Sequence, residues 1–212
     1  MTGATLFATI LFSVWVMSRR QGGAALGVVV ASILFWPEYL RIPFGLAEMS
    51  VPRLVAMLLL AKLHFSGKLS EINYGKQDAL IILSWIYMII ASFIADADFS
   101  QVSQMIGRGF DTVLMYFVAR ATILSEEDIK GLVRMLMLTG AVMGVLGIVE
   151  ALTSQSPYKS LTDYRAWHWF DKDDEYRYGL LRAKASTSVH IYFGMAMMLL
   201  CGLMWSMRGF VT

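Results

Sequence analysis

The sequence is poor in charge, in cysteine and in proline. Only 16% of its 212 residues are charged, against about 25% in an ordinary soluble domain. The single cysteine, Cys201, excludes an intrachain disulfide and a cysteine-based metal site. The four prolines lie at the edges of apolar stretches or between them. With a net charge of +2 and no basic run, nothing in the chain indicates nucleic acid as a partner.

Apolar residues are abundant instead. They make up 57% of the chain, and the mean hydropathy is +0.58, which is typical neither of a soluble domain nor of a disordered chain. A membrane-spanning helix needs about 20 mostly apolar residues. We therefore predict an all-α fold, a polytopic integral membrane bundle of about seven helices with one large external loop. The seven stretches are Thr2–Met17, Ala24–Trp36, Pro43–Leu63, Leu80–Ala95, Met105–Ile123, Ile129–Leu152 and His190–Met207.

The basic residues predict the orientation of this bundle. Arg19 and Arg20 follow the first apolar stretch instead of preceding it, which differs from a secretory signal and places the N-terminus outside. Nine basic residues then fall in cytoplasmic connections and three in short external ones, as the positive-inside rule requires. We expect a six-span bundle over residues 1–152, an external loop over 153–189, and a seventh span with a truncated cytoplasmic end over 190–212.

The predicted spans hold few polar features. The absence of ionisable residues and prolines near their centres argues against a transporter or flippase. Three glycines in the sixth stretch predict close packing against another helix, and the segment Ser125–Asp128 predicts a helix N-terminus with a capping box. Arg108 and Asp111 are three residues apart, so they are expected to pair on one helix face. The three glycines are Gly140, Gly144 and Gly147.

The predicted external loop is rich in aromatic and basic residues. One interpretation is a segment that lies in the headgroup layer of the membrane. The other is a platform for sugar rings whose basic groups hold a phosphate. Asp171–Glu175 lacks the spacing of a calcium loop, and we expect a solvated turn there and no metal. The candidate substrate-binding residues in this loop are Arg165, Trp167, Trp169 and Arg177.

The strongest local pattern lies just before the seventh span. Arg182 offers a planar, permanently charged group suited to phosphate oxygens, and Lys184 is a second candidate for substrate binding. His190 has an ordinary pKa of about 6.5, which suits a general base. If the seventh helix begins early, Arg182, Ser186 and His190 share one face. The alternatives are that Arg182 and Lys184 anchor the helix at the interface and that His190 is an interfacial polar residue.

Two segments resemble the O-antigen ligase and O-antigen polymerase superfamily. The first, Arg108–Thr153, contains a span, a short acidic turn and a glycine-rich span; the second is Gly179–Leu200, with its Arg-Ala pair, small and hydroxyl residues, and a histidine before a span. The resemblance implies a multi-span glycosyltransferase of the bacterial inner membrane. Such an enzyme takes a glycan from a polyprenyl diphosphate carrier on the external face, without metal or other cofactor. Arg182 corresponds to the arginine implied to bind the carrier diphosphate.

The chain also departs from that family. Members have about twice this length and a second external loop with further arginines and a histidine of catalytic type. We therefore expect the chain to be an N-terminal portion that is inactive alone. The alternative function is a non-catalytic membrane subunit that partners other envelope polysaccharide assembly proteins.

Overall fold

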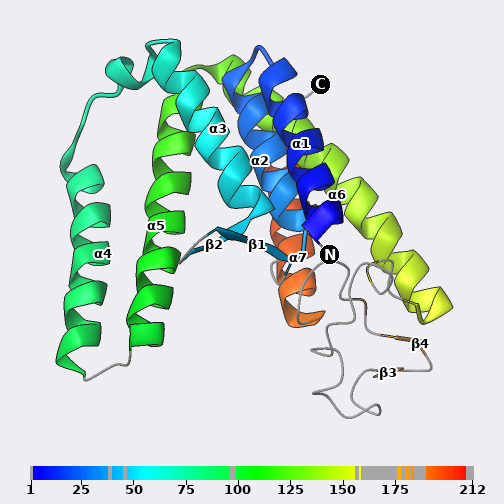
Figure 1. Ribbon diagram of the computed structural model, residues 1–212. Coiled ribbons are helices and arrows are strands. Elements are labelled where there is room, and N and C mark those ends of the chain that lie inside the picture. The colour runs from blue at the N-terminus through cyan, green and yellow to red at the C-terminus, as the bar shows by residue number, and fades with distance from the viewer. Residues whose placement is uncertain are drawn as a thin grey trace.

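The computed structural model describes residues 2–37, 40–44, 47–95, 99–155, 158, 176–177, 180–181, 183 and 190–208. These residues are mostly helical, which confirms the all-α class (Figure 1). The helices are α1 (Thr2–Ser18), α2 (Gly22–Phe35), α3 (Val51–Phe65), the short 3-10 helix η1 (Lys68–Glu71), α4 (Lys76–Ile94), α5 (Phe99–Thr122), α6 (Glu126–Thr153) and α7 (His190–Ser206). Two small antiparallel hairpins accompany them: β1 (Arg41–Phe44) with β2 (Ala47–Ser50), and β3 (Tyr176–Arg177) with β4 (Leu180–Leu181).

Successive helices run in alternating directions, so the connections gather at two ends of the molecule (Figure 1). The end at the top of Figure 1 contains the α1–α2, α3–α4 and α5–α6 connections, and we call it the basic end. The opposite end contains the β1–β2 hairpin and the end of α6, and we call it the hairpin end. The nine basic residues predicted to be cytoplasmic belong to the basic end: Arg19, Arg20, Lys62, Lys68, Lys76, Arg120, Lys130, Arg134 and Arg208.

The third predicted span is wrong in its first part. Residues 41–50 form the β1–β2 hairpin, in which Arg41 pairs with Ser50 and Pro43 with Glu48, and α3 begins only at Val51. Proline disrupts a helix interior but suits its first turn. Pro43 therefore fits the hairpin, while Pro52 lies in the first turn of α3. The polar residues Glu48 and Ser50 precede this boundary in the sequence.

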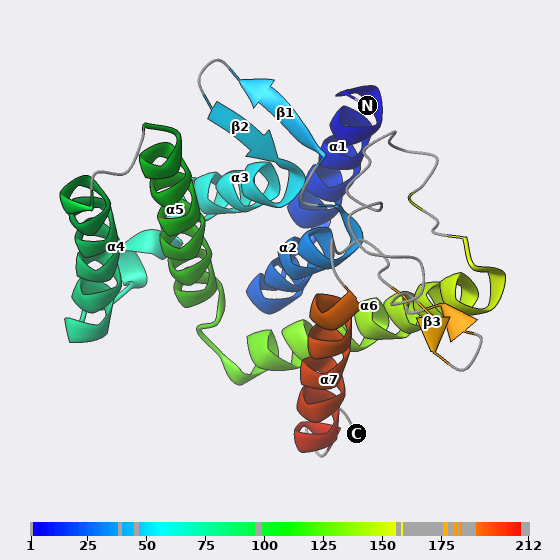
Figure 2. The same cartoon turned by 90° about the horizontal axis from the view of Figure 1, so that it is seen from below.

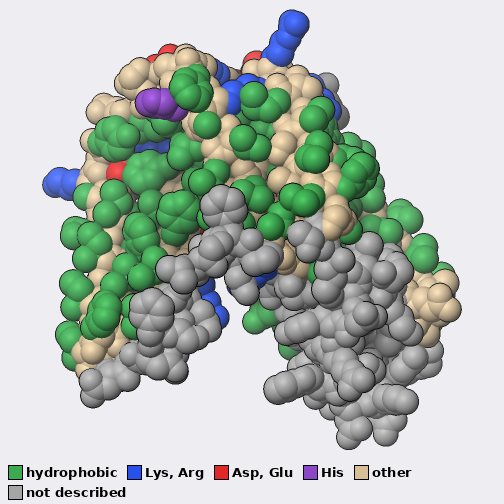
Figure 3. All heavy atoms as spheres, viewed as in Figure 1, with side chains coloured by type: hydrophobic (Ala, Val, Ile, Leu, Met, Phe, Trp, Pro, Cys, Tyr) green, Lys and Arg blue, Asp and Glu red, His purple; other side chains and the backbone are tan. Residues whose placement is uncertain are grey.

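Two of the described helices, α4 and α6, are long and apolar enough to cross a membrane. The apolar segments of α1, α2 and α7 are shorter. Asp78 is the only buried residue of α4, so this helix is not the buried core of a soluble domain. Figure 3 shows hydrophobic side chains spread over the visible face of the molecule. These observations support a membrane association, and the number of spans is taken up under the proposed function.

Helix α2 forms the centre of the bundle, packed against α1, α3, α5 and α6 (Figure 2). Ten of its residues are buried, and three of these are glycines. A Cβ atom on Gly23 would collide with the backbone of Asp128, and one on Gly27 would collide with the Cβ of Met135. Small residues let two helix backbones approach closely. The α2–α6 contact therefore depends on glycine at these positions.

Asp128 connects the starts of two helices. The predicted capping box is confirmed: the backbone N–H of Asp128 donates to Ser125 Oγ, and Ser125 N–H donates to Asp128 Oδ2 at 3.1 Å. Asp128 Oδ1 also accepts from the N–H of Gly23 in the first turn of α2, at 3.3 Å. One carboxylate thus satisfies unpaired donors of both α6 and α2, where negative charge is favoured by the helix dipoles.

The three glycines of α6 for which the sequence predicts close packing against another helix form a glycine stripe. This stripe faces α7. A Cβ on Gly147 would lie 2.7 Å from Phe193 Cζ, and Cβ atoms on Gly140 and Gly144 would lie 3.4 Å and 3.5 Å from side-chain atoms of Leu200 and Met197. The three glycines therefore form a shallow surface that receives the larger side chains of α7.

Replacing Gly27 with alanine is expected to lower the free energy of unfolding by about 1–3 kcal/mol, because the added methyl group overpacks the α2–α6 contact. The matched control is Gly202→Ala in α7, where an added Cβ meets no atom within 4 Å. That variant is expected to be neutral or slightly more stable, since alanine is the better helix former. Unfolding of the detergent-solubilised protein, followed by circular dichroism, compares the two. Equal stability of both variants contradicts the close α2–α6 approach.

Candidate functional site

Most of the candidate site residues lie outside the described residues. This applies to Arg165, Trp167, Trp169, Arg182 and Lys184. The structure describes the backbone of two others. Arg177 belongs to β3, and His190 is the first residue of α7.

The early start of the seventh helix is not found. The helix begins at His190, and the described residues Leu181 and Ala183 lie outside any helix, Leu181 being part of β4. The condition for placing Arg182, Ser186 and His190 on one helical face is therefore not met by the described residues. Residues 184–189, Ser186 among them, lie outside the described residues, and β4 is paired with β3.

The described parts of the segment before α7 lie against α6. Strand β4 contacts this helix, and a Cβ on Gly147 would lie 3.6 Å from the Cβ of Ala183. Leu181 and Ala183 flank the predicted phosphate-binding position 182. The same segment approaches the last three turns of α6, at the hairpin end of the bundle.

Glu150 is a buried carboxylate that sequence analysis did not select. It lies on α6 one turn after Gly147, and only 1% of it is exposed. A buried acidic side chain is stable only when it is paired or hydrogen-bonded. The sequence contains one available signal, since positions 143, 147 and 150 follow a helical period. In the structure the residues at all three positions are buried. A carboxylate here places an acceptor inside the hairpin end of α6.

An ion pair joins α3 and α5 at the same end. Arg53 donates to both carboxylate oxygens of Asp111, at 2.6 Å and 2.7 Å, and to the carbonyl oxygen of Gly107 at 3.4 Å. Such two-point contacts between arginine and carboxylate are strong and directional. The expected pairing of Arg108 with Asp111 is therefore wrong, since Asp111 is held by Arg53 and Arg108 is exposed.

A second polar cluster lies at the basic end, around the buried Asp78 at the start of α4. Tyr116 Oη donates to Asp78 Oδ1 at 2.8 Å, and the N–H of Gly75 donates to Oδ2 at 2.6 Å. Arg120 Nη2 donates to Asp78 Oδ2 at 3.4 Å and to the carbonyl oxygen of Asn73 at 2.9 Å. This cluster fixes α4 to α5.

Among the described residues, no group of three or more histidine, cysteine, aspartate or glutamate side chains is placed to hold a metal ion. The site chemistry that the described part supports is accordingly that of charged and hydroxyl side chains.

Comparisons with protein-family models, with curated proteins and with solved structures find no match for this chain. The resemblance to O-antigen ligases and polymerases therefore rests on the quoted residues.

The Asp111→Ala variant is expected to lower the free energy of unfolding by about 1–3 kcal/mol, because it removes two charge-assisted hydrogen bonds from a largely buried guanidinium. The control is Arg108→Ala, one turn away on the same helix, with an expected change within about 0.5 kcal/mol. Thermal unfolding in detergent measures both. An Arg108→Ala effect as large as that of Asp111→Ala rules out the α3–α5 pairing.

Proposed function

We propose that the seven α-helices cross a bacterial inner membrane. Support comes from the apolar side chains that α1, α4, α6 and α7 leave exposed, for example Phe7, Ile90, Val145 and Met198. In water these side chains would form a large uncovered patch, whereas in lipid they are the expected surface. Two of the helices shorter than a full span, α2 and α7, pack against the long helix α6.

The proposed orientation places the basic end in the cytoplasm and the hairpin end outside. It is supported by the nine basic residues at the basic end. The short external connections predicted from the sequence hold only Arg41, Arg53 and Arg108. In the structure Arg53 lies in the first turn of α3, where Asp111 neutralises it, and Arg108 lies within α5. The aromatic and basic segment after α6 then belongs to the external face.

We further propose that the protein takes part in glycan transfer from a polyprenyl diphosphate carrier at this external face. The observation that carries the proposal is the pattern Arg182-Ala-Lys184 before the span that begins at His190. The backbone on either side of position 182 lies against α6, so a ligand held there meets the bundle at the level where a lipid carrier's headgroup lies.

In the proposed reaction a hydroxyl oxygen of the acceptor attacks the anomeric carbon of the carrier-linked sugar. The bond from that carbon to the diphosphate oxygen breaks, and the diphosphate leaves with both electrons of the bond. Arg182 and Lys184 stabilise the negative charge of the leaving group. His190 accepts the proton of the attacking hydroxyl. Trp167 and Trp169 stack on sugar rings, and Arg165 and Arg177 contribute further positive charge.

In an intact, active protein that contains this chain, the Arg182→Ala variant is expected to reduce glycan transfer about 100- to 1000-fold, the usual effect of losing one preorganised charge stabiliser. The control is Arg134→Ala, an exposed arginine of α6 at the opposite end of the molecule. The measurement is carrier-dependent transfer to the acceptor in membranes, with the amount of inserted protein quantified in each sample. Near-normal transfer by Arg182→Ala at equal insertion contradicts the role of this residue and favours the non-catalytic subunit.

A further inference from the structure

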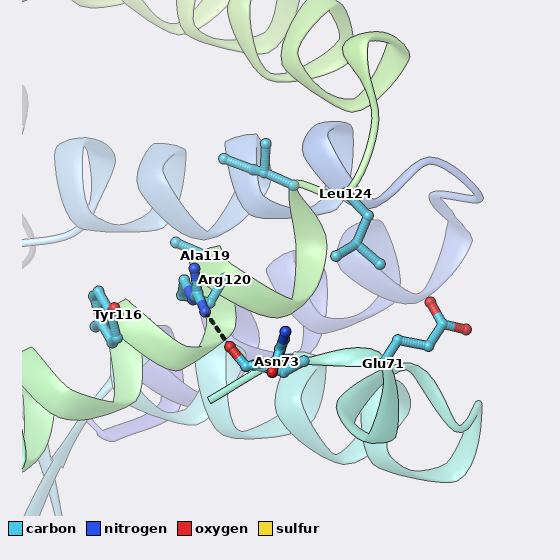
Figure 4. Close-up of a pocket in the computed structure, with 8 residues that line it drawn as sticks. Glu71, Asn73, Tyr116, Ala119, Arg120 and Leu124 are labelled. Carbon is cyan, nitrogen blue, oxygen red and sulfur yellow. Dashed lines mark hydrogen bonds between the residues drawn. The ribbon is translucent and has the colours of Figure 1, made fainter. Parts of the chain in front are cut away.

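A pocket of about 420 Å³ opens at the basic end, far along α5 from the proposed external site (Figure 4). One wall is the connection from η1 to α4, and the other is the last two turns of α5 with the residues that follow. Its polar lining residues are Glu71, Asn73, Tyr116 and Arg120, and Ile123 and Leu124 are among the apolar ones.

Arg120 lines this pocket with hydrogen-bonding capacity to spare. Its guanidinium is held in position by the carbonyl oxygen of Asn73, at 2.9 Å, and by the carboxylate of Asp78. An arginine side chain has five N–H donors. Arg120 Nε is buried 3.4 Å from Asp78 Oδ1, and Nη2 donates to Asn73 and Asp78, which leaves the two N–H groups of Nη1 as the donors available to a ligand. The side chain is 38% exposed. It is therefore oriented by the protein and still able to bind phosphate oxygens.

Glu71 contributes a carboxylate to the same pocket. It is exposed and forms no ion pair with the described residues. In the view of Figure 4, Asn73 lies between Arg120 and Glu71. The charged residues that line the pocket are one cation, Arg120, and one anion, Glu71. A ligand with both a phosphate and an ammonium group meets a complementary charge on each side.

We propose that this pocket binds the phosphoethanolamine headgroup of a phospholipid. The phosphate contacts Arg120, the ammonium group contacts Glu71, and the first carbons of the acyl chains contact the apolar lining residues Ile72 and Ala119. Assigning a lipid as the source of the headgroup rests on the proposed membrane insertion. A soluble phosphoethanolamine has the same headgroup chemistry.

Native mass spectrometry of the purified, delipidated protein in detergent tests the proposal. Phosphatidylethanolamine and phosphatidylglycerol of identical acyl chains are added in equal amounts. We expect one molecule of phosphatidylethanolamine bound in clear preference. Arg120→Gln is expected to weaken its binding at least about tenfold. Glu71→Gln, at an exposed position where folding is not at risk, is expected to abolish the preference over phosphatidylglycerol. Arg134→Gln, outside the pocket, is the control and leaves binding unchanged.

Equal binding of the two lipids to the unmodified protein, or an unchanged preference in Glu71→Gln, overturns the proposal. A further arm adds soluble phosphoethanolamine at the concentration of the lipid. Displacement of the lipid identifies a soluble ligand as the source of the headgroup, and retention identifies the phospholipid. Resistance of each variant to alkaline extraction from membranes is measured separately, so that failed insertion is not mistaken for failed binding.

Discussion

The close contact between α2 and α6 is the constraint on which the rest of the structure depends. Gly23 and Gly27 allow the two backbones to approach, and Asp128 then satisfies donors at the starts of both helices. Helix α2 in turn supports α1, α3 and α5, and α6 supports α7 through its glycine stripe. Only α4 is attached elsewhere, through α5 and the cluster around Asp78. Most of the helix packing therefore depends on a few glycine positions in α2 and α6.

One described ion pair, Arg53 with Asp111, lies at the middle of α5, where the two opposite charges neutralise each other. The other described ion pairs lie toward helix ends: Arg120 with Asp78 and Lys130 with two glutamates, at the basic end. Lys62 likewise donates to three carbonyl oxygens at the end of α1, the shortest bond being 2.7 Å to Arg19. Between these ends the helices satisfy their own backbone groups, which is the requirement that a lipid interior imposes.

The sequence predicted the features that depend on local pattern. Continuous apolar stretches located the helices, Ser125 and Asp128 marked the start of α6, and the spacing of Gly140, Gly144 and Gly147 indicated close packing against another helix, which the structure shows to be α7. It did not predict features that depend on residues distant in the chain or on the pairing of strands. Arg53 and Asp111 are 58 positions apart, the hairpin before α3 depends on the pairing of β1 with β2, and the burial of Glu150 follows from packing around it. For the candidate residues Arg177 and His190 the structure describes only the backbone. The other candidates lie outside the described residues, namely Arg165, Trp167, Trp169, Arg182 and Lys184.

The account is tested most directly by determining on which side of the membrane the two ends lie. Cys201 is the only cysteine, so a Cys201→Ser background accepts single reporters at two exposed positions, Gln155→Cys at the hairpin end and Ser70→Cys at the basic end. Intact spheroplasts are treated with a membrane-impermeant thiol reagent. The account predicts that the cysteine at position 155 reacts from outside and that the one at position 70 reacts only after lysis. Labelling of position 70 from outside, or of position 155 only after lysis, contradicts both the orientation and the external glycan-transfer site.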